Sequence, residues 1–429
     1  MLLFEDDEIY VAAHDVAQSD HDFLLITFAH IAMPTEGHGF WGQPVAEKLG
    51  IDSIGFVSRK PNWYPETSMR AAIAALAPRL ARHTRRLTYG SSQGGYGALK
   101  YASALQAAAT LAFVPQYSID PSVVGEFTRN SHRFRPDFNQ GMEITAADVA
   151  PRSYIFIDPQ DKIDRWNVEM IRAAAPGVTV IWMPHTQHRP VMTIARAEIA
   201  SLLFSAALAG DAPALGRLTA QARRASAHRS YHLFRAASVR HPVWAAGIFR
   251  REAARMVADE LLRARPLYHK VLRRLTARAS REGDVARAIA LAESAIEAAT
   301  DDASRGAALS DLASVTLRKR RGSGDAADLA AAMAAARAAL LLLPAHRPTL
   351  RVLATALGIA GAFAEAAATM RQVLALNPAD PSGHHALAGY LMRCRDRAGA
   401  IAAAQEAVAR MPDNAGFQKR LATAEAMRP

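Results

Sequence analysis

The chain has 429 residues, of which half are hydrophobic, so it can form two or three domains with substantial cores. No apolar run reaches the roughly 18 residues of a membrane span, and the acidic start from Met1 to Glu8 lacks the basic region of a signal peptide. The single cysteine, Cys394, excludes an internal disulfide and a cysteine-rich metal site. We therefore expect a protein of the reducing cytoplasm, without a metal.

The formal charge of +11 is concentrated in one segment. Residues 201–280 hold 15 basic and only 4 acidic side chains. The other parts are closer to balance, with 18 basic and 21 acidic side chains in residues 1–200 and 18 basic and 15 acidic side chains in residues 281–429. This excess favours an acidic protein, an acidic glycan or an anionic membrane surface as partner, which would place the chain at the inner face of the membrane. The alternative is an arginine-rich helical surface in solvent. No basic motif with interleaved aromatic residues is present, so we expect no nucleic acid partner.

Residues 1–208 alternate between short apolar runs and amphipathic stretches, which predicts a mainly parallel α/β sheet. The polar, irregular stretch 118–150 predicts a small lid. Expected strands lie at 8–12, 23–28, 53–57, 86–89, 110–114, 153–157 and 178–183, and expected helices at 67–82, 94–107, 162–174 and 190–208.

The fourth predicted strand runs into Gly90-Ser91-Ser92-Gln93-Gly94, and a helix-compatible stretch follows. This G-x-S-x-G pattern between a strand and a helix resembles the nucleophile elbow of the α/β-hydrolase family. The turn needs a strained serine, and the glycines keep side chains out of it. The resemblance implies that Ser92 is the nucleophile and that the Gln93 amide is an oxyanion donor. The alternative is a glycine-rich turn that binds an anion at a helix N-terminus.

In this family the nucleophile is followed by an acid and then by a histidine. The strand at 153–157 runs into a loop with three carboxylates, and family loops usually place the acid about three residues beyond the strand. That spacing selects Asp161, with Asp164 and Asp158 as alternatives. The carboxylates not chosen would cap the following helix.

The histidine belongs in the loop after the last predicted strand, which holds two. The family pattern places it four or five residues past the strand, which selects His188, with His185 as the alternative. Serine is a weak nucleophile until a base takes its proton, and the acid holds the imidazole in the required tautomer.

The second oxyanion donor should be an amide just after the strand at 23–28, at Ala29 or His30. The nearby run that contains Phe40 and Trp41, together with the pair Trp63-Tyr64, is a candidate wall for an acyl or glycan pocket. The alternative is that these aromatic residues belong to the core and loops.

From about residue 209 the strand signal disappears and helical spacing takes over. Pro344, Pro378 and Pro412 lie 34 residues apart, and each follows an alanine-rich helical segment. This pattern resembles tetratricopeptide repeats. The predicted helices precede these prolines at 332–343, 366–377 and 400–411, with partner helices starting near 350 and 384 and a capping helix at 415–429.

Two earlier units fit the period less well. Residues 288–302 match 400–414 in register, and Pro266 lies 34 residues before Thr300. The step from Thr300 to Pro344 contains ten extra residues, which we assign to a loop at 318–325. We expect a catalytic domain at 1–208, a basic helical connector at 209–268 with one degenerate repeat, and repeats at 269–429.

The resemblance to α/β-hydrolases implies a serine esterase or acyltransferase that works through an acyl-enzyme without metal or organic cofactor. The substrate would be an acyl ester, such as an acylated glycan or another cell-surface precursor, and the repeats would dock a protein partner. A homo-oligomer formed by the helices is an open alternative. The alternative function is a scaffold with an inactive hydrolase fold, whose repeats mediate protein–protein interaction.

Overall fold

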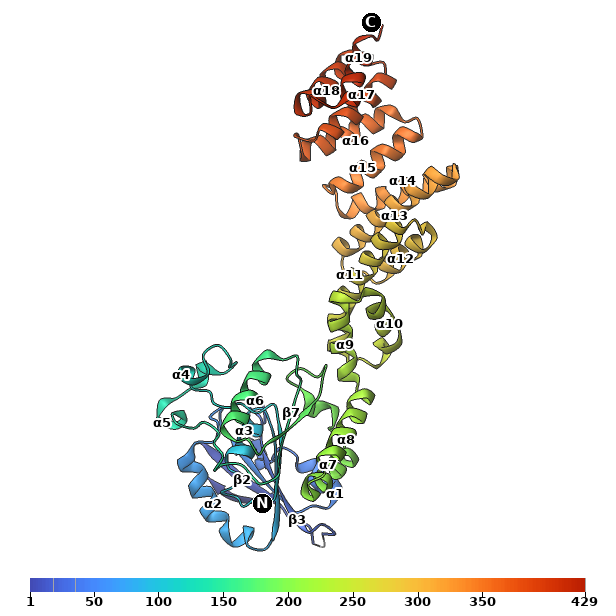
Figure 1. The fold of residues 1–429 in the computed structure, drawn as a ribbon. Coiled ribbons are helices and arrows are strands. Elements are labelled where there is room, and N and C mark those ends of the chain that lie inside the picture. The colour runs from blue at the N-terminus through green and yellow to red at the C-terminus, as the bar shows by residue number, and fades with distance from the viewer. Residues whose placement is uncertain (18, 35, 429) are drawn as a thin grey trace. The chain divides into compact units, whose positions relative to one another are not determined.

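The computed structural model describes residues 1–17, 19–34 and 36–428. The chain divides into two compact units, Met1–Leu233 and Phe234–Pro429. Within the described residues, the first unit is an eight-stranded sheet with helices on both faces, and the second consists of helices (Figure 1). No helix in this part of the chain combines the length and apolar character that a membrane crossing needs.

The sheet has the strand order β1-β2-β4-β3-β5-β6-β7-β8 and is parallel from β4 to β8. Strands β1 and β2 add an antiparallel edge. All seven predicted strands are present, and only β1 escaped prediction because it is short and at most half-buried. The bounds are β1 (Leu2–Glu5), β2 (Ile9–His14), β3 (Phe23–Phe28), β4 (Ser53–Ser58), β5 (Arg85–Ser91), β6 (Ala109–Phe113), β7 (Ser153–Ile157) and β8 (Thr179–Trp182).

Helices cover both faces of the sheet, so its central strands are buried on both sides. In β3, Leu24 and Ile26 pack with helices α2, α3 and α6, whereas Phe23 and Leu25 pack with α1, α7 and α8. This arrangement explains why β3 is apolar throughout instead of alternating. The helix bounds are α1 (Gln43–Leu49), α2 (Glu66–Leu80), α3 (Gln93–Lys100), α6 (Lys162–Ala174), α7 (Ala197–Ala209) and α8 (Ala212–Ala225).

Some predicted helices differ in extent. The helix predicted at 94–107 ends at Lys100, and the one predicted at 190–208 is split into a 3-10 turn and α7. The stretch 118–150 contains only short helical turns. The bounds are η1 (Glu36–His38), α4 (Pro121–Val124), η2 (Ser131–Arg133), α5 (Pro136–Asn139) and η3 (Pro190–Thr193).

The helical unit is an α-solenoid of tetratricopeptide-like helix pairs, as predicted. Helices α14, α16 and α18 precede the three prolines of the 34-residue period, and Ala332, Ala366 and Ala400 are fully buried where helices cross. The bounds are α9 (Ala227–Arg240), α10 (Pro242–Glu252), η4 (Ala253–Arg255), α11 (Ala258–Glu282), α12 (Val285–Glu297), α13 (Asp302–Ser323), α14 (Ala326–Leu342), α15 (Arg347–Ile359), α16 (Phe363–Leu376), α17 (Pro381–Arg393), α18 (Arg397–Arg410) and α19 (Ala415–Glu425).

The structure corrects two details of the repeat prediction. Pro266 lies inside α11 and does not close a repeat. The ten extra residues do not form a loop at 318–325, because α13 continues to Ser323 and both α13 and α14 are lengthened.

The predicted boundary at 208 also falls inside the first compact unit. That unit runs to Leu233 and includes α8, which packs its buried Leu215 and Ala222 into the core on one face of the sheet.

Candidate active site

Ser92 lies in the turn between β5 and α3, in a strained backbone conformation with φ 57° and ψ −121°. A Cβ atom added at Gly90 would lie 2.0 Å from the carbonyl oxygen of Gly94, and one at Gly94 would lie 2.1 Å from that of Phe28. Both glycines are therefore required by close backbone contacts. The Ser92 amide donates to the carbonyl of Phe113 at 2.8 Å, which ties the turn to β6.

The structure brings Ser92 and His188 together, as the sequence predicts. The Ser92 hydroxyl oxygen lies 3.1 Å from Nε2 of His188, and Nδ1 of His188 lies 2.9 and 2.8 Å from the two carboxylate oxygens of Asp164. Because a carboxylate only accepts hydrogen bonds, Nδ1 carries the hydrogen and Nε2 can accept the proton of Ser92. Asp164 is 1 % exposed, so this Ser–His–Asp chain is held at its acidic end by a buried group.

The structure places Asp164, and not the predicted Asp161, against the imidazole of His188. Asp161 is the N-cap of α6 and accepts the amides of Ile163 and Asp164 at 3.2 and 3.1 Å. Asp164 lies one helical turn further on and faces His188. Asp161 is thus a helix-capping carboxylate, a role that the sequence analysis assigned to its neighbours.

The remaining carboxylate, Asp158, is fully buried and shapes the turn that carries the histidine. One of its oxygens accepts the backbone amides of Thr186 and Gln187 at 2.9 and 2.8 Å. Its contact with this turn positions His188 but does not orient the imidazole directly.

Within the described part of the chain, Ser92 contacts the imidazole of His188 and not that of the alternative base, His185. Burial lowers the pKa of His185, and its Nδ1 is buried without a hydrogen-bond partner among the described residues. The structure therefore separates the two histidines of the loop.

Of the predicted oxyanion donors, Ala29 has both of its backbone groups in hydrogen bonds within the protein. Its amide donates to the carbonyl of Phe56 at 2.9 Å and its carbonyl accepts the Tyr64 hydroxyl at 2.6 Å, so neither group is free to face a substrate. The Gln93 amide opens α3, where helical N–H groups lack intrahelical partners. The His30 amide follows Ala29 directly and is the remaining candidate on that loop.

The segment 118–150 reaches the site through Arg129, a residue that the sequence did not reveal. Its guanidinium donates to both carboxylate oxygens of Asp161 at 2.6 and 2.7 Å and to Asp164 at 2.8 Å. It also lies 3.5 Å from Nδ1 of His188. Burial opposes the charge of Arg129, but the two carboxylates outweigh burial and raise its pKa. The only sequence signal was a basic residue in a polar, irregular segment.

A second ion pair anchors this segment to the start of the chain. Arg135 donates to Glu8 at 2.6 Å, and Asn62 and Lys60 also contact that carboxylate. Burial alone would raise the pKa of Glu8, but the hydrogen bonds from Arg135, Asn62 and Lys60 outweigh it and lower the pKa to about 2.

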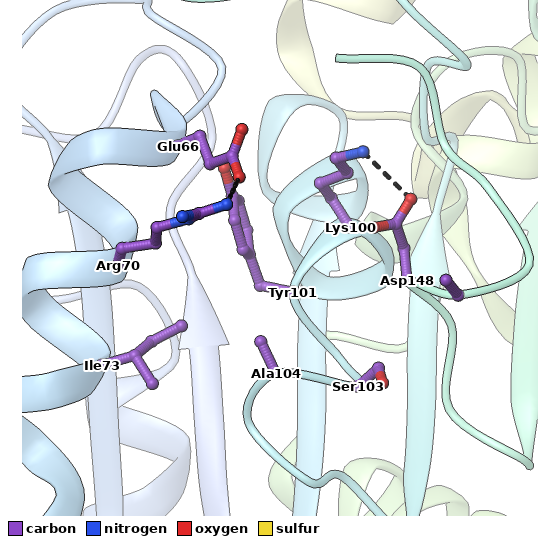
Figure 2. Close-up of a pocket in the computed structure, with 9 residues that line it drawn as sticks. Glu66, Arg70, Ile73, Lys100, Tyr101, Ser103, Ala104 and Asp148 are labelled. Atoms are coloured by element: carbon purple, nitrogen blue, oxygen red, sulfur yellow. Dashed lines mark hydrogen bonds and ion pairs between the residues drawn. The ribbon is translucent and has the colours of Figure 1, made fainter. Parts of the chain in front are cut away.

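The C-terminal part of the segment is fixed at a polar cavity of about 330 Å³ between α2 and α3 (Figure 2). There Lys100 contacts Asp148 at 3.0 Å and the carbonyl of Glu143 at 2.7 Å, while Arg70 pairs with Glu66. The charged side chains at this cavity are therefore paired with one another, and the contacts of Lys100 hold the segment 118–150 against α3.

The aromatic residues suggested as pocket walls divide into two groups. Phe40 and Trp41 line an apolar cavity of about 340 Å³. Trp63 and Tyr64 are instead buried in the core, where the Trp63 indole nitrogen donates to Gln116 at 3.3 Å. Among the described residues, no cluster of three or more His, Cys, Asp or Glu side chains is arranged to hold a metal ion.

No protein-family model matches the chain, and no curated protein matches it. Solved structures similar to its helical part are tetratricopeptide proteins. TTC0263 of Thermus thermophilus is 18 % identical over 47 % of this chain and 100 % of its own, with a TM-score of 0.33. YrrB, described as having an unusual peptide-binding site, is 14 % identical over 45 % and 91 %, with a TM-score of 0.35. MamA from Desulfovibrio magneticus is 16 % identical over 43 % and 97 %, with a TM-score of 0.33.

Proposed function

We propose that the first unit is a serine esterase or acyltransferase of the α/β-hydrolase type. The observation that carries this proposal is the hydrogen-bonded chain from Ser92 through His188 to the buried Asp164, with the serine on a strained turn. Strain at a non-glycine residue persists only where the surrounding structure enforces it, and it clusters at functional sites.

The proposed reaction runs through an acyl-enzyme. Nε2 of His188 takes the Ser92 proton as the hydroxyl oxygen attacks the ester carbonyl, and Asp164 stabilises the resulting imidazolium. The amides of Gln93 and His30 would hold the oxyanion. His188 then returns the proton to the leaving alcohol. Water or an acceptor alcohol subsequently attacks the acyl-enzyme, with His188 as base again, and regenerates Ser92.

A fluorophosphonate probe and p-nitrophenyl esters test this proposal. Wild-type protein should be labelled and turn over esters, and Ser92→Ala should lose both, with a fall in rate on the order of 10³-fold or more. Ser91→Ala is the matched control, because Ser91 is the adjacent buried serine of the same turn. Labelling that survives in Ser92→Ala but disappears in Ser91→Ala would identify the other serine as the nucleophile.

The helical repeats support a second proposal, that the solenoid binds an acidic protein partner, either to bring it to Ser92 or as the scaffold function itself. Arg318, Arg321 and Arg351 line a cavity of about 190 Å³ between α13 and α15. Attraction between charged surfaces weakens as added salt shortens the Debye length, which is about 8 Å at physiological ionic strength.

A pull-down with the full chain at low and high salt tests this second proposal. Partners should be captured at low salt and lost at high salt, and Arg321→Glu should reduce their capture. If the amount of captured partner changes neither with salt nor with Arg321→Glu, electrostatic docking at this cavity is excluded. A dimer of the chain without other partners would favour a homo-oligomer.

A further inference from the structure

An apolar cavity of about 340 Å³ lies where three segments of the first unit meet. Phe40 and Trp41 come from the loop between β3 and α1, Val45 comes from α1, and Tyr89 comes from β5. Val191 and other residues of η3 complete the lining.

Each of these segments is continuous with a part of the candidate active site. Tyr89 lies three residues before Ser92, Val191 lies three residues after His188, and the loop with Phe40 also contains His30. The Tyr89 ring lies 4.5 Å from that of Trp41 and also packs on Phe113 and Phe204. Residues that line the cavity therefore lie close in the sequence to Ser92 and His188.

The lining defines the chemistry that the cavity accepts. None of the described residues that line it carries a charged side chain, and a charged group transferred there would lose its hydration without a partner. Burial raises the pKa of Tyr89, so its phenol stays neutral. Tyr89 and Trp41 bring two polar groups to this lining, a phenol hydroxyl and an indole N–H, and each can hydrogen-bond a polar atom of a ligand.

The volume limits the size of the ligand. At roughly 30 Å³ per heavy atom, which is the share of a water molecule in the liquid, 340 Å³ holds about ten heavy atoms. The cavity lies at the small end of the range for ligand pockets. A long fatty acyl chain or a glycan would extend out of this cavity.

We propose that this cavity receives the acyl group of the ester attacked by Ser92, and that this group is uncharged, apolar and about four to eight carbons long. This assignment rests on the proposed esterase or acyltransferase function. It narrows the ligand of this pocket to an uncharged acyl group. The hydroxyl groups of a glycan would meet an apolar lining, and a charged acyl group would lose its hydration.

Turnover of p-nitrophenyl esters from two to sixteen carbons by the full-length protein tests the proposal. Wild type should show its highest kcat/KM between four and eight carbons and at least tenfold less at sixteen. Val45→Trp narrows the cavity and should lower the ratio of eight-carbon to two-carbon kcat/KM about tenfold, whereas Val45→Ala should move the optimum to longer chains. Turnover with a chain-length profile that neither variant changes would overturn the assignment and leave the esterase function in place.

Binding of octanamide, an uncharged compound that the enzyme does not consume as an ester, separates failure of the two proposals. Calorimetry should show binding to wild type and at least tenfold weaker binding to Val45→Trp. If labelling and turnover are absent but this pattern holds, the catalytic proposal fails and the apolar binding site stands. Absence of octanamide binding to the wild type would overturn the site.

Discussion

The replacement Asp164→Asn is the sharpest test of the site, because it distinguishes two carboxylates that lie three residues apart. In the structure both Asp164 oxygens lie within 2.9 Å of Nδ1 of His188. An asparagine amide in the same place can donate to Nδ1, which favours the tautomer with hydrogen on Nε2 and removes the base from Ser92. Loss of the carboxylate in a serine triad lowers kcat about 10⁴-fold, equivalent to about 5.5 kcal/mol of transition-state stabilisation.

The matched control is Asp161→Asn. Asparagine caps helices as well as aspartate does, so α6 should be retained, and only the charged contacts with Arg129 are weakened. We expect kcat within about tenfold of wild type for this variant. Initial rates with p-nitrophenyl butyrate and the rate constant of fluorophosphonate labelling measure both effects.

Stability has to be followed in the same experiment, because Asp164 also accepts a hydrogen bond from Arg129. Loss of part of a buried polar contact costs about 1–3 kcal/mol, which corresponds to a fall in Tm of roughly 2–12 °C for a unit of this size. A 10³-fold loss in Asp161→Asn together with near-normal turnover in Asp164→Asn would refute the assignment of the acid.

Two further predictions concern the 118–150 segment. Arg129→Met removes its ion pairs with Asp161 and Asp164, so limited proteolysis within the segment should accelerate several-fold, whereas Arg165→Met on exposed α6 surface should not change it. Glu8 has a pKa of about 2 in the folded chain, below its usual 4.5, so its stabilisation is complete above about pH 4.5 and is lost as the pH falls toward 2. The free energy of unfolding of wild type should exceed that of Glu8→Gln by on the order of 3 kcal/mol at neutral pH, and the gap should close near pH 2. A gap that does not depend on pH would mean that the ion pair is not its source.

The fold was largely predictable because its signals are local. Strands buried on both faces appear as continuous apolar runs, and β3 and β7 were predicted with their observed bounds. The 34-residue period identified the helix pairs through the prolines that follow α14, α16 and α18. The ten extra residues were assigned to a loop because an insertion lengthens the spacing between repeats equally, whether it lies in a loop or in longer helices.

The errors in the site have a common cause, since they depend on how separate segments meet. The spacing after β7 does not reveal which carboxylate of the first turn of α6 faces the histidine loop. Ala29 was predicted as a donor because the sequence does not show that the pairing of β3 with β4 continues one residue beyond the end of β3. There the Ala29 amide donates to the carbonyl of Phe56. Arg129 comes from a segment without periodicity, and its partners lie 32 and 35 residues away.

Two of the three carboxylates after β7 contact the histidine loop in different ways, which leads to a last prediction. Asp158 holds the backbone of the histidine turn, whereas Asp164 holds the imidazole itself. Asp158→Asn exchanges one accepting oxygen for a donor, so the contacts with the amides of Gln160, Thr186 and Gln187 cannot all be kept, and we expect a 10- to 100-fold fall in kcat. Both replacements act through the orientation of one imidazole, so their effects should not be additive.

A double-mutant cycle measures this coupling. The fall in kcat of the Asp158→Asn/Asp164→Asn protein should be smaller than the product of the falls in the two single variants. A histidine that is already in the wrong tautomer loses little further activity when the turn that carries it shifts. Tm values of all four proteins serve as the control for folding. If the two effects on kcat simply multiply, Asp158 does not act through His188, and its contacts with Thr186 and Gln187 contribute to stability alone.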